Sequence, residues 1–502
     1  MGYPWVNKIV SRKAARLKQF CSVPYEIQQS QLLDLVRYAE HTEIGKKYSY
    51  HSIYSIDDYR KRVPLHHYDD IKVYFEKTRN GEQNVFWPTD IHWFAKSSGT
   101  TSDKSKFIPV SYEGLTQCHF RGGKDVLAIY SELYPRHRLF SGKCLTLGGS
   151  HQMDRGNANV RQGDLSAIMI HNIPSWIQLF RAPQKKVALI ADWEEKLEKL
   201  TREVVRQNIT SFAGVPSWNL VLMKHILEVT GKKTLYDIWP RMELFMHGGV
   251  SFKPYEEQYR KILPSPDMHY METYNASEGF FAIQNDLQDE GMLLMLDYGI
   301  FYEFIPVEHI HDEKPETCHI GEVELNKNYA VVISSNNGLW RYIIGDTVKF
   351  TSLFPHKIVI TGRTRHFINA FGEELIVENA ESALHEACLG TGAMITDYTA
   401  APVFMSDTSK GAHEWVIEFE KEPDDMNRFS DLLDKALMKR NSDYEAKRFK
   451  SITIGCPIVR KVPRNTFYRW FEEKHKLGGQ NKMPRLSNDR RYLEEVLKLT
   501  VS

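Results

Sequence analysis

The sequence predicts an α/β protein in which a large N-terminal domain of layered sheets and helices is followed by a small α+β domain. Two observations support this prediction. Between residues 211 and 249, strand-like apolar runs alternate with a helical pattern, an order typical of α/β layers. Between residues 350 and 365 the pattern changes, with Pro355, a short strand and Gly362 close together. We therefore expect a domain boundary near residue 360, which divides the chain into residues 1–360 and 361–502.

Composition excludes several classes of protein. Among the 502 residues, 65 Lys and Arg nearly balance 64 Asp and Glu, so no overall field recruits nucleic acid or an anionic membrane. The six cysteines lie far apart without a C-x-x-C pair, which excludes a zinc ribbon and gives no disulfide framework. The apolar runs are too short or too often interrupted to span a membrane. We expect a cytoplasmic protein that holds any anionic ligand at a local site.

Periodicity and capping residues locate helices in the first half of the chain. A first helix is predicted by four apolar residues at helical spacing, Leu32, Leu35, Val36 and Ala39. Asp192 is placed to cap a later helix, and Gly231 to end the helix predicted at residues 217–230. Residues 164–170 fit either a pocket wall or a buried helix. The polar run at residues 66–70 fits a surface turn better than a metal site.

The stretch FAKSSGTTSDKSKFIPV, residues 94–110, contains a loop suited to phosphate. Residues 97–102 are all Ser, Thr or Gly, so hydroxyl and backbone N–H donors converge, and Lys104 and Lys106 add positive charge. Neither a P-loop pattern nor a G-x-G-x-x-G run is present. A solvated turn is the alternative interpretation. Beyond the loop, the sequence predicts a buried strand with Pro109 at a sheet edge.

Two later stretches offer groups for a nucleotide. METYNASEG, residues 271–279, suits base stacking by Tyr274 and Mg²⁺ binding by Glu278, and a loop with an N-cap serine is the alternative. In LWRYIIGD, residues 339–346, Asp346 follows a glycine where a strand is expected to end. A carboxylate at such a position accepts two ribose hydroxyls. The alternative there is a simple Gly-Asp turn.

The region after residue 365 predicts an α+β unit. Its helices are expected near residues 377–388, 429–437 and 466–476, and its strands at residues 415–419 and 451–459. The last feature is LGGQNKMPR, residues 477–485, in which Lys482 lies on a glycine-flanked loop. Such a lysine is suited to being carried into an active site, and a surface loop after a glycine C-cap is the alternative.

In their order and spacing, the stretches SSGTTSDKSK, YNASEG, YIIGD, a switch region and GGQNKMPR resemble the auxin-responsive (Gretchen Hagen) acyl acid–amido synthetases of plants and their bacterial relatives. The resemblance covers essentially the whole chain, which is identified as a bacterial-type member. It implies an adenylate-forming, AMP-releasing carbon–nitrogen ligase with a mobile C-terminal lid. ATP would activate a carboxylic acid as an acyl-adenylate with loss of pyrophosphate, and the amine of an amino acid would then take the acyl group.

The resemblance also implies roles for individual residues. Lys482 and Lys106 would act in catalysis, and Glu278 would hold Mg²⁺. The residues implied to bind ATP are Ser97, Ser98, Gly99, Thr100, Thr101, Thr273, Tyr274, Ser277, Asp346 and Arg363. The residues implied to line the acyl or acceptor pocket are Ile168, His171, Val215, His247, Gly248 and Gly249.

The chain departs from the plant pattern in two places. Asp103 stands where a glycine is usual, and Ile343-Ile344 replaces a pair that contains arginine. No base for the amine step stands out, with His247 and Glu278 as the candidates. Coenzyme A as the acceptor, or a binder of ATP and carboxylate without turnover, are the alternative functions. The identity of the acid and the oligomeric state stay open.

Overall fold

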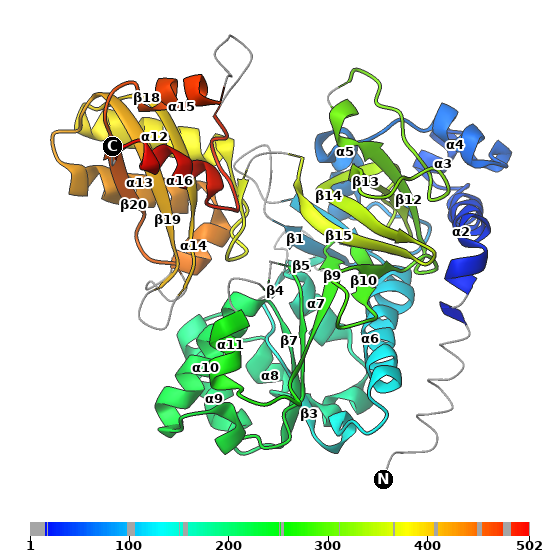
Figure 1. Ribbon diagram of the computed structural model, residues 1–502. Coiled ribbons are helices and arrows are strands. Elements are labelled where there is room, and N and C mark those ends of the chain that lie inside the picture. The colour runs from blue at the N-terminus through cyan, green and yellow to red at the C-terminus, as the bar shows by residue number, and fades with distance from the viewer. Residues whose placement is uncertain are drawn as a thin grey trace.

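The structure, a computed structural model, describes residues 16–17, 19–97, 106–149, 151–153, 159–249, 252, 256–310, 312–364, 367–405, 410–448, 454–474 and 483–500. A large part built from the first three quarters of the chain carries layered sheets and helices (Figure 1). A smaller C-terminal unit, coloured yellow to red, stands to one side of it. The expected mixture of a large α/β part and a small α/β unit is confirmed, and the boundary near residue 360 stays a prediction.

An eleven-stranded sheet organises the large part. Its order is β12 (Ile300–Pro306), β13 (Asn328–Ser335), β14 (Tyr342–Leu353), β15 (His356–Arg363), β11 (Met292–Leu294), β10 (Gly279–Gln284), β9 (His269–Ala276), β8 (Leu244–His247), β7 (Ile209–Gly214), β3 (Lys143–Thr146) and β6 (Arg181–Ala182). Strands β6, β3, β7, β8 and β9 are parallel, and the others pair antiparallel. The carboxyl ends of the parallel strands therefore share one edge of the sheet.

Helices accompany the parallel strands, as βαβ connections require. They are α7 (Leu165–Asn172), α8 (Lys185–Ala188), α9 (Trp193–Val204), α10 (Pro216–Thr230) and α11 (Glu256–Ile262). Asp192 accepts a hydrogen bond from the Glu195 backbone N–H at 2.8 Å, and Gly231 has a φ of +66°, so both predicted helix boundaries are confirmed. Residues 165–172 form helix α7 after the N-cap Asp164, and Ile168 is fully buried in it, as the buried-helix interpretation expects.

A four-stranded sheet lies next to these strands in the order β2 (Lys106–Val110), β1 (Trp93–Ser97), β5 (Arg161–Gly163) and β4 (His151–Met153). Strand β2 is at the edge, which explains why Pro109 is tolerated, because an edge residue needs no ladder donor on its outer side. The antiparallel strands β1 and β2 bring the two ends of the serine- and threonine-rich loop together. The loop itself, residues 98–105, lies outside the described residues.

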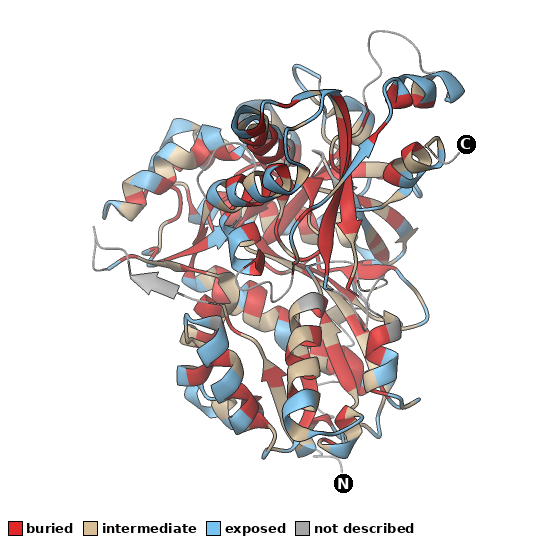
Figure 2. Ribbon diagram, turned by 90° about the vertical axis from the view of Figure 1, so that its left-hand side faces the viewer, coloured by how far each residue is buried: buried red, intermediate tan, exposed pale blue. Residues whose placement is uncertain are grey.

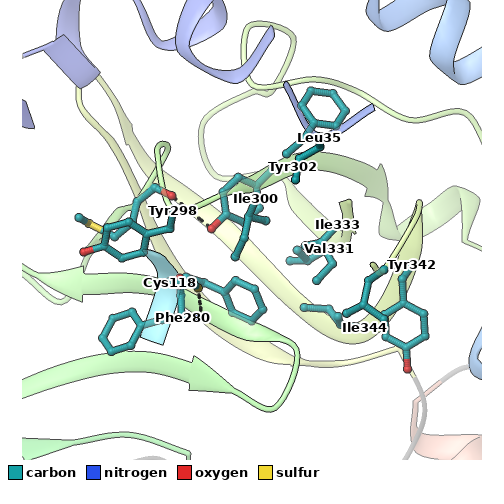
Figure 3. Close-up of a cluster of buried hydrophobic side chains, with 14 of the residues drawn as sticks. Leu35, Cys118, Phe280, Tyr298, Ile300, Tyr302, Val331, Ile333, Tyr342 and Ile344 are labelled. Carbon is teal, nitrogen blue, oxygen red and sulfur yellow. Dashed lines mark hydrogen bonds between the residues drawn. The ribbon is translucent and has the colours of Figure 1, made fainter. Parts of the chain in front are cut away.

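The N-terminal helices cover the antiparallel half of the sheet. They are α2 (Pro24–Tyr38), α3 (Glu43–Lys47), α4 (Ile56–Arg62) and α5 (Tyr68–Arg79), and α6 (Phe120–Leu133) follows a π-helical segment, η2 (Gly114–His119). The four apolar residues predicted for the first helix are buried, and α2 packs on β12. Together with strand residues such as Tyr302 and Ile333 they form one large core (Figures 2 and 3).

The surface turn expected at residues 66–70 is wrong. His67 and Asp70 form a capping box at the start of α5, and His66 is buried with its Nδ1 2.7 Å from the Trp340 carbonyl oxygen. The polar run is therefore a helix N-terminus held against the sheet. In the part of the chain that the structure describes, no group of three or more His, Cys, Asp or Glu is arranged to hold a metal ion.

The C-terminal unit is a three-stranded sheet, β18 (Met394–Val403), β19 (Ala412–Lys421) and β20 (Ile458–Val462), with helices on both faces. The helices are α12 (Val377–Thr391), α13 (Met426–Arg440), α14 (Ser442–Arg448), α15 (Thr466–Glu473) and α16 (Arg491–Lys498), and a small ribbon, β16 (Phe367–Ile368) and β17 (Leu375–Ile376), precedes them. Of the strand expected at residues 451–459, the structure describes residues 454–459. Ile454 forms an isolated parallel bridge with Gly411, and the strand β20 with its ladder to β19 runs over Ile458–Val462. No described helix is both long and apolar enough for a membrane span.

A buried ion pair fixes the start of β14. The Arg341 guanidinium donates to both carboxylate oxygens of Glu303 at 2.9 and 3.0 Å, and its side chain is 8% exposed while that of Glu303 is 1% exposed. Arg341 also donates to the backbone oxygens of Arg60 and Val63, which end α4. This pair therefore joins the N-terminal helices to strands β12 and β14.

Replacing Glu303 by Ala is expected to destabilise the large part by about 3–5 kcal/mol, because it leaves a buried guanidinium without its counter-charge. Urea unfolding followed by tryptophan fluorescence measures the loss. The control is Glu198→Ala on α9, whose ion pair with Arg202 is exposed and should leave the free energy of unfolding nearly unchanged. Equal, small losses in both variants would contradict the importance of the buried pair.

Candidate functional site

The carboxyl ends of β7, β8 and β9 bring several predicted pocket residues together. The Thr273 hydroxyl donates to the His247 carbonyl oxygen at 3.1 Å. A Cβ on Gly248 would lie only 2.3 Å from the Thr273 carbonyl oxygen, so the close approach of these two backbone segments requires glycine. Gly249 has a φ of +83°, and a Cβ there would meet the Val215 side chain. These three segments form one wall at the edge of the parallel strands.

Tyr274 and Asp346 are in direct contact. The Tyr274 hydroxyl donates to Asp346 Oδ2 at 2.6 Å, and the Tyr274 ring packs edge-on against Phe281. Asp346 in turn lies opposite Arg363 in the pairing of β14 with β15. Tyr274, Asp346 and Arg363, which the sequence predicted for one site, thus lie on three separate strands that the fold brings together.

The local setting of both motifs differs from the expectation. Residues 271–279 are not a loop with an N-cap serine: they form β9, a tight turn at Ser277 and Glu278, and the start of β10. Asp346 lies inside β14 rather than at a strand end, because that strand pairs with β13 and β15 across the motif. Gly345 has a φ of +94° and interrupts the ladder, and this bulge resembles a turn in the sequence.

Lys106 is buried against two tyrosines. Its Nζ donates to the Tyr342 hydroxyl at 3.4 Å, and it lies 5.7 and 5.9 Å from the ring centroids of Tyr68 and Tyr342. The Tyr68 hydroxyl accepts a hydrogen bond from the Phe107 backbone N–H at 2.8 Å. Since Tyr342 and Asp346 are on the same strand, Lys106 is linked to the Tyr274–Asp346 pair. Sequence reasoning missed both tyrosines, although Tyr342 opens the YIIGD motif.

Glu278 is 7% exposed, and its carbonyl oxygen accepts a hydrogen bond from Asn337 Nδ2 at 3.4 Å. Its carboxylate suits Mg²⁺ rather than a metal held entirely by protein, because Mg²⁺ takes one or two carboxylates and completes its shell with phosphate and water.

The remaining predicted residues are less completely placed. His171 contacts the four-stranded sheet, with its Nε2 2.9 Å from Arg161 Nη1 and its ring 4.9 Å from that of Trp93. Ser97 ends β1 and Arg363 ends β15. The predictions for Ser98, Gly99, Thr100, Thr101 and Lys482 fall on residues outside those that the structure describes.

His247 is poorly suited to act as a base. Its side chain is buried, its ring stacks on Phe252 at 4.4 Å between centroids, and burial lowers its pKa to about 3. A group that is protonated only near pH 3 is a weak proton acceptor at neutral pH, since efficient bases have a pKa near the working pH. We therefore assign His247 to the wall and not to proton transfer.

The fold combines a parallel half-sheet with glycine turns at its carboxyl edge, an antiparallel half that carries the tyrosine–aspartate pair, and a small C-terminal α/β unit. Solved structures share this fold. The GH3.15 acyl acid amido synthetase matches with a TM-score of 0.60 at 16% identity, covering 98% of this chain and 96% of that one. A 2-hydroxyisobutyryl-CoA ligase in complex with 2-HIB-AMP and CoA matches with a TM-score of 0.56 at 13% identity, covering 94% and 91%.

The particular family follows from the sequence comparisons. The chain matches the GH3 family N-terminal domain over residues 13–268, the central domain over residues 293–363 and the C-terminal domain over residues 378–491. It therefore belongs to the GH3 family. Similar proteins include the indole-3-acetic acid-amido synthetase GH3.3 of Arabidopsis thaliana, 21% identical over 88% of this chain and 85% of that protein. The jasmonoyl–L-amino acid synthetase GH3.5 of Oryza sativa subsp. japonica is 23% identical over 86% and 87%.

The low pKa of His247 has a measurable consequence. Its imidazole nitrogen shifts should stay constant from pH 8 to pH 5, because the folded protein keeps the neutral ring. The unfolded chain takes up this proton near pH 6.5, so this residue lowers folding stability as the pH falls from about 6.5 towards 3. Nitrogen-15 NMR measures the shifts, and His247→Phe identifies the signal. A titration midpoint near 6.5 would contradict the buried setting.

Proposed function

We propose that this protein is an ATP-dependent acyl acid–amido synthetase that joins a carboxylic acid to the amine of an amino acid. As a GH3 enzyme it is an AMP-forming ligase that uses ATP as a substrate. The observation that carries the proposal is the Tyr274–Asp346 contact beside the glycine-lined edge of the parallel strands. A bacterial type of the family is part of this proposal and rests on the resemblance of the motifs in their order and spacing.

In the first step, the acid's carboxylate attacks the α-phosphorus of ATP, and the bond to the bridging oxygen of pyrophosphate breaks. Tyr274 stacks its ring on the adenine, and Asp346 accepts hydrogen bonds from the ribose hydroxyls. Lys106 supplies positive charge, which lowers the cost of bringing two anions together. Glu278 would hold Mg²⁺, which when bound neutralises charge on the phosphates. The hydroxyl-rich segment from Ser97 to Thr101 supplies donors to the same oxygens.

In the second step, the amine attacks the acyl carbon, the bond to AMP breaks, and the ammonium product loses a proton. The wall made by Thr273, Gly248 and Val215 is a neutral surface on which the acyl group is placed. The two named relatives act on different acids, since one is an indole-3-acetic acid-amido synthetase and the other a jasmonoyl–L-amino acid synthetase. The acid and the amino acid therefore have to be found by screening.

The second candidate is an acyl-CoA ligase that shares the first step. The fold likeness to 2-hydroxyisobutyryl-CoA ligase favours keeping it. A cytoplasmic location without nucleic-acid or membrane partners stays a prediction from composition. A catalytically inactive binder of ATP and carboxylate is the third possible outcome.

The test is acid-dependent exchange of labelled pyrophosphate into ATP over a library of carboxylic acids. Exchange with particular acids is expected. Amino acids or coenzyme A are then added, and the products are identified by mass. An amide supports the proposal, and a thioester replaces it with the second candidate. Absence of exchange over a broad library, with ATP bound, would leave a binder.

Asp346→Ala is expected to weaken ATP binding about ten- to 150-fold, because charge-assisted hydrogen bonds worth roughly 1.5–3 kcal/mol are lost. The matched control is Tyr274→Phe, which removes the hydroxyl that contacts Asp346 but keeps the ring for stacking. It should change ATP affinity by no more than about fivefold, the scale of one ordinary hydrogen bond. Isothermal calorimetry measures both. Unchanged affinity in folded Asp346→Ala would remove this residue from the nucleotide site.

Lys482→Ala is expected to slow adenylate formation about 10²–10³-fold, the effect of losing one preorganised charge donor. Supplied with synthetic acyl-adenylate, the same variant should form the amide at nearly the normal rate. The reason is that the C-terminal unit carries this lysine to the site only for the first step, turning near Arg363. Single-turnover assays of each step measure the difference. Equal losses in both steps would exclude the moving lid, and no loss would make Lys482 a surface residue.

A further inference from the structure

The turn that carries Glu278 is held from behind by a buried asparagine. Asn337 is 1% exposed and lies in the turn between β13 and β14. Its Nδ2 donates to the Glu278 carbonyl oxygen at 3.4 Å, and its Oδ1 accepts from the Ser111 backbone N–H at 2.9 Å. Ser111 directly follows β2, the strand that leaves the serine- and threonine-rich loop. One side chain thus joins the Glu278 turn, the β1–β2 hairpin and the start of β14.

The space around Asn337 leaves it little freedom. A Cβ on Gly114 would lie 1.9 Å from Asn337 Oδ1, so the first residue of η2 has to be glycine. The Ser111 hydroxyl donates to the Asn336 carbonyl oxygen at 2.6 Å and accepts from the Gly114 backbone N–H at 2.8 Å. The orientation of the Asn337 amide is therefore fixed by contacts on several sides.

The same helical segment holds the rest of the β9–β10 hairpin. The Phe280 backbone N–H donates to Cys118 Sγ at 3.1 Å. His119 Nδ1 lies 3.0 Å from Asn275 Oδ1, and burial lowers the pKa of His119 to about 4, so the ring is neutral and donates to that oxygen. Glu278 lies between these two contacts along the chain, and the Asn337 side chain bonds to the Glu278 backbone itself.

We infer that Asn337 is a positioning residue that aims the Glu278 carboxylate at the divalent cation of the ATP complex. This inference rests on the proposed function, in which Glu278 holds that cation. A carboxylate on a two-residue turn reaches a fixed point only if its backbone is fixed. Groups that orient a metal ligand commonly change metal affinity by 10–100-fold when they are removed. Asn337 acts on the metal through Glu278 and ties that point to the loop expected to bind the phosphates.

Asn337→Asp tests the inference, because aspartate still accepts from Ser111 but cannot donate to the Glu278 carbonyl. The matched control is Asn336→Asp in the same turn. Asn336 is also buried, and its Nδ2 donates to the Tyr298 carbonyl oxygen instead. Asn337→Ser, which adds no charge, serves if the aspartate variant does not fold. Mn²⁺ binding is measured by electron paramagnetic resonance at saturating ATP, and thermal melting reports folding.

Asn337→Asp and Asn337→Ser are expected to weaken Mn²⁺ binding about tenfold while metal-free ATP binding stays near normal, and Asn336→Asp should keep normal Mn²⁺ binding. Unchanged Mn²⁺ binding in a folded Asn337 variant, with a large loss in Glu278→Gln, would overturn the inference alone. Unchanged binding in Glu278→Gln as well would overturn the metal role of Glu278. Equal weakening in Asn336→Asp would reduce Asn337 to a structural residue and also overturn the inference.

Discussion

The buried contact between Arg341 and Glu303 is the constraint on which the geometry of the site depends. Arg341 has a φ of +43°, a conformation that costs an L-residue roughly 1–2 kcal/mol. Its contacts with Glu303 and the end of α4 offset this cost. The arginine therefore sets both the point and the direction in which β14 begins. The positions of the β14 residues from Tyr342 to Asp346 therefore depend on where and in which direction the strand begins.

The N-terminal helices connect the backbone at Arg341 to strand β2, which follows the loop proposed to bind phosphate. The His66 backbone donates to the carbonyl oxygen of Arg341, just before β14, and accepts from the N–H of Ile343 on β14. Two residues later, Tyr68 begins α5 and bonds to the first residues of β2, beside Lys106. The start of β14 thus positions Lys106 in two ways. Tyr342 contacts the lysine directly, and His66 pairs with β14 and leads to Tyr68, which contacts the lysine as well. A lysine that is proposed to act on the phosphates has to be placed in advance, because preorganised charge costs no reorganisation during the reaction.

Local patterns in the sequence were sufficient for elements whose causes are local. The helices α2, α9 and α10 and the strands β7 and β8 follow from periodicity and from capping residues such as Asp192. The position of Asp346 inside a strand did not follow, because a glycine before an aspartate is typical of a turn and only pairing on both sides extends β14 past it. Tyr342 and Asn337 were missed for a related reason: their partners Lys106 and Ser111 are 236 and 226 residues away in the chain. The residues of the motifs were predictable, and the side chains that hold them were not.

Charge is distributed unequally across the site, and burial is the cause. His119 and His247 lie on the inner segments around β8 and β9, and burial lowers their pKa values to about 4 and about 3, so both rings are neutral at physiological pH. Lys106 supplies positive charge next to the loop proposed to bind phosphate. The cationic group thus lies next to the loop where the proposed adenylation would develop negative charge, while the wall proposed for the acyl group stays neutral. An amine attacks the acyl carbon only in its uncharged form, and its nitrogen becomes positively charged as the bond forms. A neutral wall does not repel this charge, whereas protonated histidines would. The placement of histidines in a dry interior therefore suits an enzyme whose second reactant is an amine.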